Sequence, residues 1–367
     1  MRHNPGLLLR RVIVCCSALA PLLTPGAPAT ATSTAPSTEA ASLPFQQRYN
    51  VVQHGGIVRA ANSSITCRTA PRSADAVSCL GAREGSAAAN GDFDMFYIDV
   101  DSDPNTYNSS RGEVRLPRGA RVTYARLYWG GNLRVGEQKP PRSNKRVLIA
   151  EPGGAYKEVL ADTVVGHRVA RGADAYQASA DVTKLVRSSG PGLYTVAQVN
   201  VAMGRSTAGA WGGWTLVVAY EDESQPRRRL AVWDGFTTLA PDRDQVVRLP
   251  RMTFPAGADG WVGLVAYNGD RETRGDSLDL SVDQGQPIPL GDAANPPDDI
   301  LNSTISEPGL TASDRSPAHA NTLGYDSDVL DVSEHVRHGG DRLVFRMASQ
   351  RDAAWVGVLF VALDATP

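Results

Sequence analysis

Five oxygen-bearing side chains gather in one short segment and form the best candidate for a metal site: Asp99, Asp101, Asp103, Asn105 and Asn108. Carboxylates and amides are the hard oxygen ligands that calcium prefers, and extracellular calcium is concentrated enough to fill weak sites. The spacing is not that of an EF-hand, because Pro104 stands where that loop has glycine and Ser110 where it has glutamate. The alternative is a turn whose Asp and Asn side chains bond to their own backbone.

Tryptophans offer a second kind of chemistry, because an exposed aromatic face can pack against a sugar ring. Trp211 and Trp214 flank Gly212 and Gly213, and the glycine pair predicts a turn. These two tryptophans are therefore the candidate ligand-binding residues, with a glycan or a cell-envelope component as the partner. The alternative is packing in the core, since tryptophan is highly buried on average.

The cysteines indicate a disulfide. Of the four cysteines, Cys15 and Cys16 fall in the predicted signal peptide described below, which leaves Cys67 and Cys79. Two cysteines in an exported chain usually pair. A redox or zinc site is the alternative, but two cysteines without a nearby histidine supply too few ligands for zinc.

Catalytic motifs are weak by comparison. Residues 275–278 spell Gly-Asp-Ser-Leu, the block of one serine-hydrolase family, yet the Asp-x-x-His partner of that block is absent from the sequence. No phosphate-binding Gly-x-x-x-x-Gly-Lys-Ser/Thr loop occurs either. We therefore expect a protein that binds rather than catalyses. The alternative is a secreted carbohydrate-active enzyme, which would need two carboxylates about 5–10 Å apart in one cleft.

The N-terminus is typical of an exported protein. Basic residues precede an apolar stretch at 12–23 and small residues follow it, so residues 1–29 are predicted to be a signal peptide. Residues 30–44 are rich in Ala, Ser, Thr and Pro, which predicts a linker. No later run reaches eighteen apolar residues, so we expect no membrane span in the mature chain, which we predict to be secreted and extracellular.

Composition and patterning favour a globular β protein. Hydrophobic residues make up 42% of the 367, charged residues 21%, and 35 Gly and 24 Pro are too many for a helical bundle. The formal net charge of −2 argues against a nucleic-acid partner. Runs of β-branched, aromatic and alternating residues, separated by Gly, Pro, Asn and Asp, predict strands at 121–129, 193–201, 214–220, 230–233, 261–267, 278–282, 342–347 and 356–363.

Two stretches of the chain resemble each other. Residues 181–187 read DVTKLVR and residues 331–337 read DVSEHVR, and each is a predicted helical turn capped by its Asp. Each leads to a strand, a loop with a tryptophan and an apolar strand that ends in an acid. Upstream, LYWGG at 127–131 aligns with VAYNG at 265–269. The shared order predicts an internal duplication with a boundary near 221–229, and convergent strand–turn patterning is the alternative.

Two longer motifs resemble a known family. The run DVDSDPNTYNSS at 99–110, followed by RLPRGARVTYARLYWGG at 115–131, resembles the opening module of secreted bacterial surface proteins in a family of unknown function. The run AWGGWTLVVAYEDESQPRRRLAVWDGF at 210–236 resembles the second signature of that family, so the resemblance covers about residues 45–240. It implies β-sandwich modules, often placed ahead of repeated surface domains, and it implies no activity.

Together these patterns predict an all-β chain of two tandem antiparallel β-sandwich domains, of the jelly-roll or immunoglobulin-like kind, derived from an internal duplication. The first domain would span residues 45–225 and the second 226–367. We expect an exported, non-enzymatic protein with a binding or structural role at or near the cell surface. A secreted carbohydrate-active enzyme or a glycan-binding module is the alternative, and calcium is the one cofactor that the residues suggest.

Overall fold

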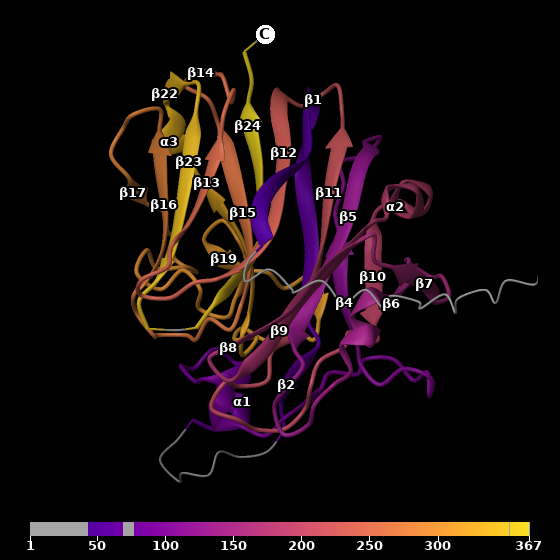
Figure 1. Ribbon diagram of the computed structural model, residues 1–367. Coiled ribbons are helices and arrows are strands. Elements are labelled where there is room, and N and C mark those ends of the chain that lie inside the picture. The colour runs from indigo at the N-terminus through magenta and orange to yellow at the C-terminus, as the bar shows by residue number, and fades with distance from the viewer. Residues whose placement is uncertain (1–42, 69–76, 352, 367) are drawn as a thin grey trace, which may run out of the picture. The chain divides into compact units, whose positions relative to one another are not determined.

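Antiparallel strands build nearly all of the structure, so the predicted all-β class is confirmed (Figure 1). The computed structural model describes residues 43–68, 77–351 and 353–366. The predicted signal peptide, residues 1–29, and residues 30–42 of the predicted linker lie outside the described residues. Residues 43 and 44, which were also predicted to be linker, are instead the first residues of β1 (Leu43–Ser63). No helix within the described ranges is long and apolar enough to cross a membrane.

The first half of the chain forms two facing sheets. The main sheet contains, in spatial order, the C-terminal part of β1 (Leu43–Ser63), β11 (Gly212–Glu221), β5 (Arg121–Asn132), β9 (Ala173–Asp181) and β8 (Thr163–Ala170). The smaller sheet contains β4 (Ser109–Val114), β10 (Gly192–Ala197), β6 (Arg146–Ala150) and β7 (Lys157–Leu160). The side chains between these sheets form a core that includes Trp129 and Trp214.

The second half is built in the same way. Its main sheet contains β12 (Arg227–Thr238), β24 (Trp355–Asp364), β15 (Gly260–Tyr267), β21 (Tyr325–Asp331), β18 (Ile305–Glu307) and β19 (Leu310–Thr311). Its smaller sheet contains β13 (Gln245–Leu249), β23 (Leu343–Ser349), β16 (Asp276–Val282) and β17 (Ile288–Pro289). Two further pairs are β2 (Ile65–Cys67) with β3 (Met95–Tyr97) and β14 (Phe254–Ala256) with β22 (His338–Gly340).

The two halves share the order of their inner strands. In the main sheets, β1–β11–β5–β9 corresponds to β12–β24–β15–β21, and in the smaller sheets β4–β10–β6–β7 corresponds to β13–β23–β16–β17. A short helix follows the fourth main strand in each half, α2 (Thr183–Ser189) after β9 and α3 (Ser333–Val336) after β21. The backbone N–H of Val182 donates to the Ala125 carbonyl at 2.9 Å, and that of Val332 donates to the Gly260 carbonyl at 2.9 Å. Position 332 is therefore equivalent to position 182.

The acids before the two helices accept a backbone N–H at each helix start, as predicted, from one position ahead of the N-cap residues Val182 and Val332. Asp181 Oδ1 accepts the Thr183 N–H at 2.9 Å, and Asp331 Oδ1 accepts the Ser333 N–H at 2.7 Å. Each carboxylate thus satisfies one of the backbone donors that a helix start leaves free.

The register of the main sheets corrects one part of the sequence alignment. Ala180 pairs with Leu127, and its equivalent Leu330 pairs with Val262. Leu127 therefore corresponds to Val262, whereas the sequence motifs align it with Val265. The error has a physical reason: small, apolar and aromatic residues fill both buried strands, so short motifs look alike in more than one phase.

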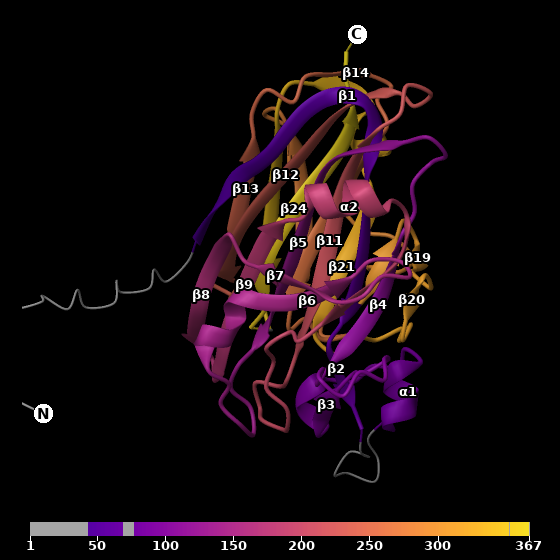
Figure 2. The same cartoon turned by 90° about the vertical axis from the view of Figure 1, so that its right-hand side faces the viewer.

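Strand β1 joins the two halves and was not predicted. Its residues 43–54 pair with β12 and its residues 55–63 pair with β11, so the strand changes partner at Gly55. Figure 2 shows the arched course of β1. Gly55 has a φ of +137°, and an added Cβ would lie 2.0 Å from the Tyr220 carbonyl oxygen, so glycine is required there.

The halves also interlock through a second exchange. The short strand β20 (Arg315–Ser316), which belongs to the second half, pairs with β4 at the edge of the first half's smaller sheet. All described residues accordingly fall in one compact unit.

The two main sheets are continuous through β1 as one eleven-stranded sheet, and the second faces of its two parts pack against each other. Along β11, Leu216 and Val218 point into the first half's core, while Val217 and Ala219 point into a central core that both halves share. The central core contains aromatic side chains from both halves: Trp211, Tyr267, Tyr325 and Trp355. The order across Figure 1 is therefore smaller sheet, main sheet, main sheet, smaller sheet.

Candidate functional site

The Asp-rich segment forms a tight turn before β4. Asp101 Oδ1 accepts the Asp103 N–H at 2.8 Å and the Thr106 hydroxyl at 3.0 Å, while Tyr156 donates to Asp101 Oδ2. Burial opposes ionisation of Asp101, but these hydrogen bonds prevail and lower the pKa of its carboxyl group. Asn105 donates to Asp103 Oδ1 through its backbone at 2.9 Å and its side chain at 2.8 Å. The carboxylates are thus engaged by local donors.

The remaining two members of the predicted metal set serve other contacts. Asp99 Oδ1 accepts the Ser109 hydroxyl at 2.8 Å. Asn108 is buried, donates to the Val199 carbonyl at 2.8 Å and accepts the Val199 N–H at 3.0 Å. In the described part of the chain, no three His, Cys, Asp or Glu side chains are grouped so as to hold a metal ion. Calcium binding by residues 99–108 stays a prediction.

Trp211 and Trp214 are both fully buried, at 0% exposure. Trp211 lies in the central core, 4.9 Å between ring centroids from Trp355, and Trp214 lies in the first half's core, where its indole N–H donates to Ser110 at 2.9 Å. Neither ring presents a face to solvent, so the structure corrects the expectation of exposed tryptophans. The reason is that Gly212 and Gly213 do not form a turn but begin strand β11. One face of this strand packs into the first half's core and the other into the central core.

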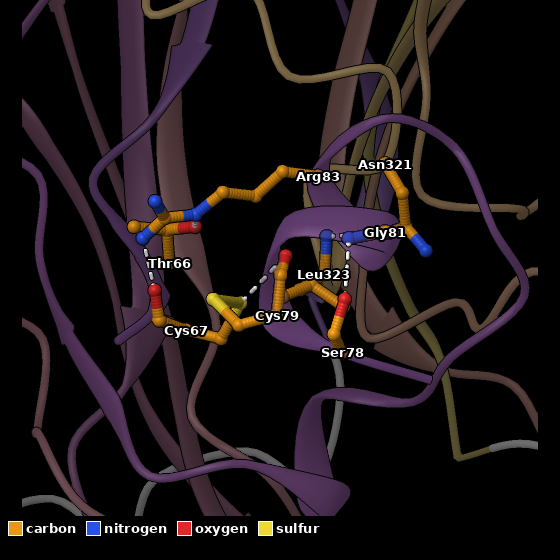
Figure 3. The surroundings of a disulfide bond; sticks show 8 residues. All are labelled: Thr66, Cys67, Ser78, Cys79, Gly81, Arg83, Asn321 and Leu323. Atoms are coloured by element: carbon orange, nitrogen blue, oxygen red, sulfur yellow. Dashed lines mark hydrogen bonds between the residues drawn. A yellow bond between two sulfur atoms is a disulfide. The ribbon is translucent and has the colours of Figure 1, made fainter. Parts of the chain in front are cut away.

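The predicted disulfide is present. Cys67 and Cys79 are joined with an S–S distance of 2.07 Å, at the end of β2 and the start of α1 (Cys79–Arg83). Figure 3 shows that Arg83 points back toward β2, where its guanidinium donates to Thr66 at 3.2 Å and to the Cys67 carbonyl. The bridge and this arginine together hold α1 against β2.

A pocket beside the bend of β1 is the better candidate for ligand binding. This β1-bend pocket has a volume of about 260 Å³ and is lined by residues of several strands, among them Tyr220, Arg228, Trp261, Glu307, Val329 and Phe360. The lining combines aromatic and apolar side chains with one cation and one carboxylate. Such a mixture is typical of small-molecule sites, although most of these are somewhat larger, at roughly 300–1,000 Å³.

The cation of the pocket is held in place from three sides. Arg228 Nε donates to Asp364 Oδ1 at 3.0 Å, and Nη1 donates to the Gly55 carbonyl at 2.9 Å. Its guanidinium lies 4.9 Å from the centroid of the Trp261 ring, which makes a cation–π contact. A fixed guanidinium on an indole ring can orient a ligand without losing side-chain entropy on binding.

The carboxylate of the pocket is also engaged. Glu307 Oε1 lies 3.4 Å from Nη2 of the buried Arg59. Glu307 is the sole carboxylate among the described residues that line the pocket. The lining therefore lacks the carboxylate pair that glycoside hydrolysis uses.

Sequence reasoning missed this pocket for a definite reason. Arg228 was assigned to a charged boundary segment and Trp261 to a core strand, and 33 positions separate them in the chain. Only the pairing of β12 and β15 with β24 brings them together.

These features define a β-sandwich-like all-β protein with one disulfide and a small aromatic pocket. Residues 90–258 match the family described as "Protein of unknown function (DUF3344)". The resemblance to a family of unknown function is thus confirmed for that stretch. None of the curated proteins matches the chain.

Three solved structures overlap with the chain at low similarity. The major capsid protein P2 of bacteriophage PM2 has 13% identity and a TM-score of 0.19, covering 84% of this chain and 96% of that one. A conserved protein of unknown function from Pseudomonas aeruginosa PAO1 has 12% identity and a TM-score of 0.20, with coverages of 84% and 99%. Quercetin 2,3-dioxygenase from Acinetobacter baumannii has 11% identity and a TM-score of 0.18, with coverages of 86% and 87%. Scores this low carry no functional argument.

Proposed function

We propose that this protein is an exported, non-enzymatic β-sandwich protein that binds a ligand at or near the cell surface. The observation that carries the proposal is the β1-bend pocket, where Arg228 is fixed against Trp261. The N-terminal pattern supports export, and the disulfide between Cys67 and Cys79 fits an oxidising compartment.

The ligand that suits this pocket is a single ring of a glycan or of another cell-envelope component. Aromatic side chains offer an apolar face to such a ring, and the guanidinium of Arg228 offers fixed donors to its oxygens. The volume of about 260 Å³ matches one ring better than an extended chain. A secreted carbohydrate-active enzyme is the second candidate, and it would have to place its catalytic carboxylates elsewhere.

We further propose that the two halves are tandem antiparallel β-sandwiches derived from one duplicated unit. The shared order of the inner strands and the equivalent bonds of Val182 and Val332 support this origin. If the two halves had arisen independently, the same strand order and the same backbone hydrogen bond would have had to arise twice.

The binding proposal is tested on the mature chain, residues 30–367, secreted from a host that forms disulfides. Glycan arrays and isolated cell-envelope polysaccharides are the probes. We expect a glycan signal that falls at least tenfold in Trp261→Ala. Arg346→Gln is the matched control, because this arginine pairs with Asp244 and Asp279 on the second half's smaller sheet, away from the pocket.

Two outcomes would contradict the proposal. A glycan signal that is equal in wild type and Trp261→Ala, with both proteins folded by circular dichroism, would exclude this pocket as the site. New reducing ends released from a polysaccharide by the wild type would favour the enzyme instead.

A further inference from the structure

A buried group of oxygen atoms lies in the second half, where β18 runs parallel to β21. We name it the oxygen cluster, and its members are all at most 2% exposed: Asn295, Asn302, Thr304, Ser306, Asp326 and Asp328. Asp326 and Asp328 are two apart on β21 and so point to the same side of the sheet. The cluster is separate from the β1-bend pocket, with which it shares no lining residue.

The hydroxyl of Thr304 has more acceptors than it can serve. Its Oγ1 lies 2.6 Å from Asn302 Oδ1, 2.8 Å from Asn295 Oδ1 and 3.0 Å from Asp328 Oδ1. A hydroxyl has one proton, so it can donate to one of these oxygens. At least one of the others therefore approaches it as acceptor against acceptor.

The orientation of Asn302 is set by the contact on its nitrogen side. Asn302 Nδ2 donates to the Ala294 carbonyl at 2.9 Å, whereas Asn295 Nδ2 lies 2.7 Å from the Ser306 hydroxyl, which can pair with either end of an amide. Rotating Asn302 would place its oxygen against that carbonyl. The amide oxygen of Asn302 therefore belongs on the Thr304 side.

The two carboxylates lack sufficient donors. Asp328 Oδ1 accepts the Ser306 hydroxyl at 2.7 Å and Asp326 Oδ1 accepts the Thr304 N–H at 3.2 Å, but Oδ2 of each has no hydrogen-bond partner among the described residues. Burial raises the pKa of both carboxyl groups, and neighbouring carboxylates add to the rise. For Asp328 the hydroxyls of Ser306 and Thr304 and the charge of Arg59 offset part of it. A buried carboxylate oxygen that accepts no hydrogen bond destabilises the folded state.

Two arginines lie near the pair but are used elsewhere. Arg59 Nη2 donates to the Ser306 carbonyl at 2.6 Å and lies 3.4 Å from Glu307, while Arg271 Nη2 donates to the Ala320 carbonyl at 2.8 Å. Neither arginine forms an ion pair with Asp326 or Asp328 in the described part of the chain. Their charges act at longer range.

The first half shows that the fold does not need acids at these positions. The equivalence of Val182 and Val332 makes Tyr176 the counterpart of Asp326 and Ala178 the counterpart of Asp328. Both counterparts are buried in an apolar core. The fold can therefore be built with apolar or aromatic residues at these two positions. The presence of Asp326 and Asp328 in the second half needs a separate explanation.

We propose that the oxygen cluster is a calcium-binding site. Asp326 and Asp328 would supply the charge, and Asn295, Asn302 and Thr304 would supply neutral oxygens, which together form the hard donor set of calcium. A divalent cation would relieve the contacts between acceptors and neutralise both carboxylates. Within the described ranges, no group of three or more His, Cys, Asp or Glu side chains could hold a metal ion. The proposed site does not conflict with this finding, because only two of its five ligands are acids.

The test uses the mature, disulfide-bonded chain, freed of metal with a chelator. Isothermal titration with calcium chloride at pH 7.5 is followed by measurement of retained calcium after desalting. We expect one site in the wild type and a loss of at least tenfold in affinity in Asp328→Asn. At a hundredfold excess of calcium over its dissociation constant, the unfolding equilibrium constant should fall about hundredfold.

Two further variants distinguish calcium binding at the oxygen cluster from binding at the turn before β4 and from a purely structural role. The double variant Asp101→Asn/Asp103→Asn alters that turn and should leave the binding unchanged. Asn302→Asp adds a third carboxylate, so it should unfold more easily without metal and gain a larger calcium-dependent shift in melting temperature. A purely structural role for Asn302 predicts the destabilisation without the larger shift, and this comparison also serves if Asp328→Asn does not fold.

Three results would overturn the proposal. One is a wild type that neither retains calcium nor melts differently in millimolar calcium, which would leave shared protonation of Asp326 and Asp328 as the account of the cluster. Another is calcium binding that persists in Asp328→Asn at full affinity. The third is binding that disappears in Asp101→Asn/Asp103→Asn, which would assign the ion to the turn.

Discussion

Thr183 and Ser333 hold the same structural position in the two halves of the chain. The hydroxyl of Thr183 accepts the backbone N–H of Ala125 at 2.9 Å, and that of Ser333 accepts the N–H of Gly260 at 3.1 Å. Each short helix is therefore tied by one side chain to the strand beside it, β5 or β15. Both strands belong to the main sheets, so these ties position the helices on the sheet framework.

Removing either hydroxyl should destabilise the protein. Thr183→Val and Ser333→Ala each leave a backbone N–H without its acceptor, and we expect a loss of about 1–3 kcal/mol in the free energy of unfolding. Urea unfolding measures the loss. Ser188→Ala is the control, because this exposed hydroxyl bonds to its own helix. Equal stability of all three variants would show that the two hydroxyls do not anchor the helices.

The strands and the two capped turns could be predicted from the sequence because their signals are local. Each of the eight predicted runs lies in or overlaps a strand of the structure, and Asp181 and Asp331 each accept the first backbone N–H of the helix that follows. Strand β1 could not be predicted in this way, because its polar N-terminal residues pair with β12, about 180 residues later in the chain. Its stability comes from partners and not from its own pattern.

The candidate site shows the same division. The disulfide was predictable because only two cysteines lie outside the predicted signal peptide. The burial of Trp211 was not, because the central core exists only where the two main sheets meet. The contact between Arg228 and Trp261 could not be predicted for the same reason. It depends on the order of the strands in the sheet and not on the spacing of the two residues in the sequence.

The bend of β1 should be sensitive to substitution at Gly55. Gly55→Ala would place a methyl group against the Tyr220 carbonyl in a backbone conformation that alanine disfavours, and we expect a cost of about 3 kcal/mol. Gly257→Ala is the control, because its φ is +78° but an added Cβ meets nothing within 4 Å. It should cost about 1 kcal/mol. Similar midpoints for the two variants in urea unfolding would contradict the steric account.

The ion pair between Arg48 on β1 and Asp234 on the neighbouring strand β12 should contribute to stability. Arg48 donates to both oxygens of Asp234 at 2.7 Å, and Tyr128 donates to Asp234 at 3.1 Å. Asp234→Asn would leave these donors without their charged partner in a buried place, and we expect a loss of about 3 kcal/mol. The control is Asp244→Asn on the more exposed pair with Arg346, which should cost at most about 1 kcal/mol. Equal losses would mean that burial does not strengthen the first pair.

The disulfide should contribute to stability mainly through the unfolded chain. Cys67 and Cys79 are 12 positions apart, and closing a loop of that size is worth about 3 kcal/mol in the chain-entropy model. Replacing both cysteines with alanine should lower the free energy of unfolding by that amount. Mass spectrometry of the unreduced wild type must first find the two residues linked, and free thiols at these positions would remove the basis of this prediction.

His319 should make the protein less stable in mild acid. Burial lowers the pKa of its imidazole to about 4, and the nearby guanidinium groups of Arg83 and Arg315 act in the same direction. In the unfolded chain the imidazole takes up a proton below pH 6.5, whereas in the folded chain it stays neutral until about pH 4. The unfolded state therefore binds more protons across this window, so stability falls as the pH drops from 6.5 to 4.

The effect can be isolated by comparison with His319→Asn, which cannot take up this proton. Asp326 and Asp328 contribute in the opposite sense, because a carboxyl group with a raised pKa favours the folded state as the pH falls. Their contribution is common to both proteins and cancels in the difference. We expect the melting temperatures of wild type and variant to differ by a constant amount above pH 7 and the wild type to lose stability relative to the variant between pH 6.5 and pH 4. Melting curves that stay parallel down to pH 4 would show that His319 titrates normally in the folded protein.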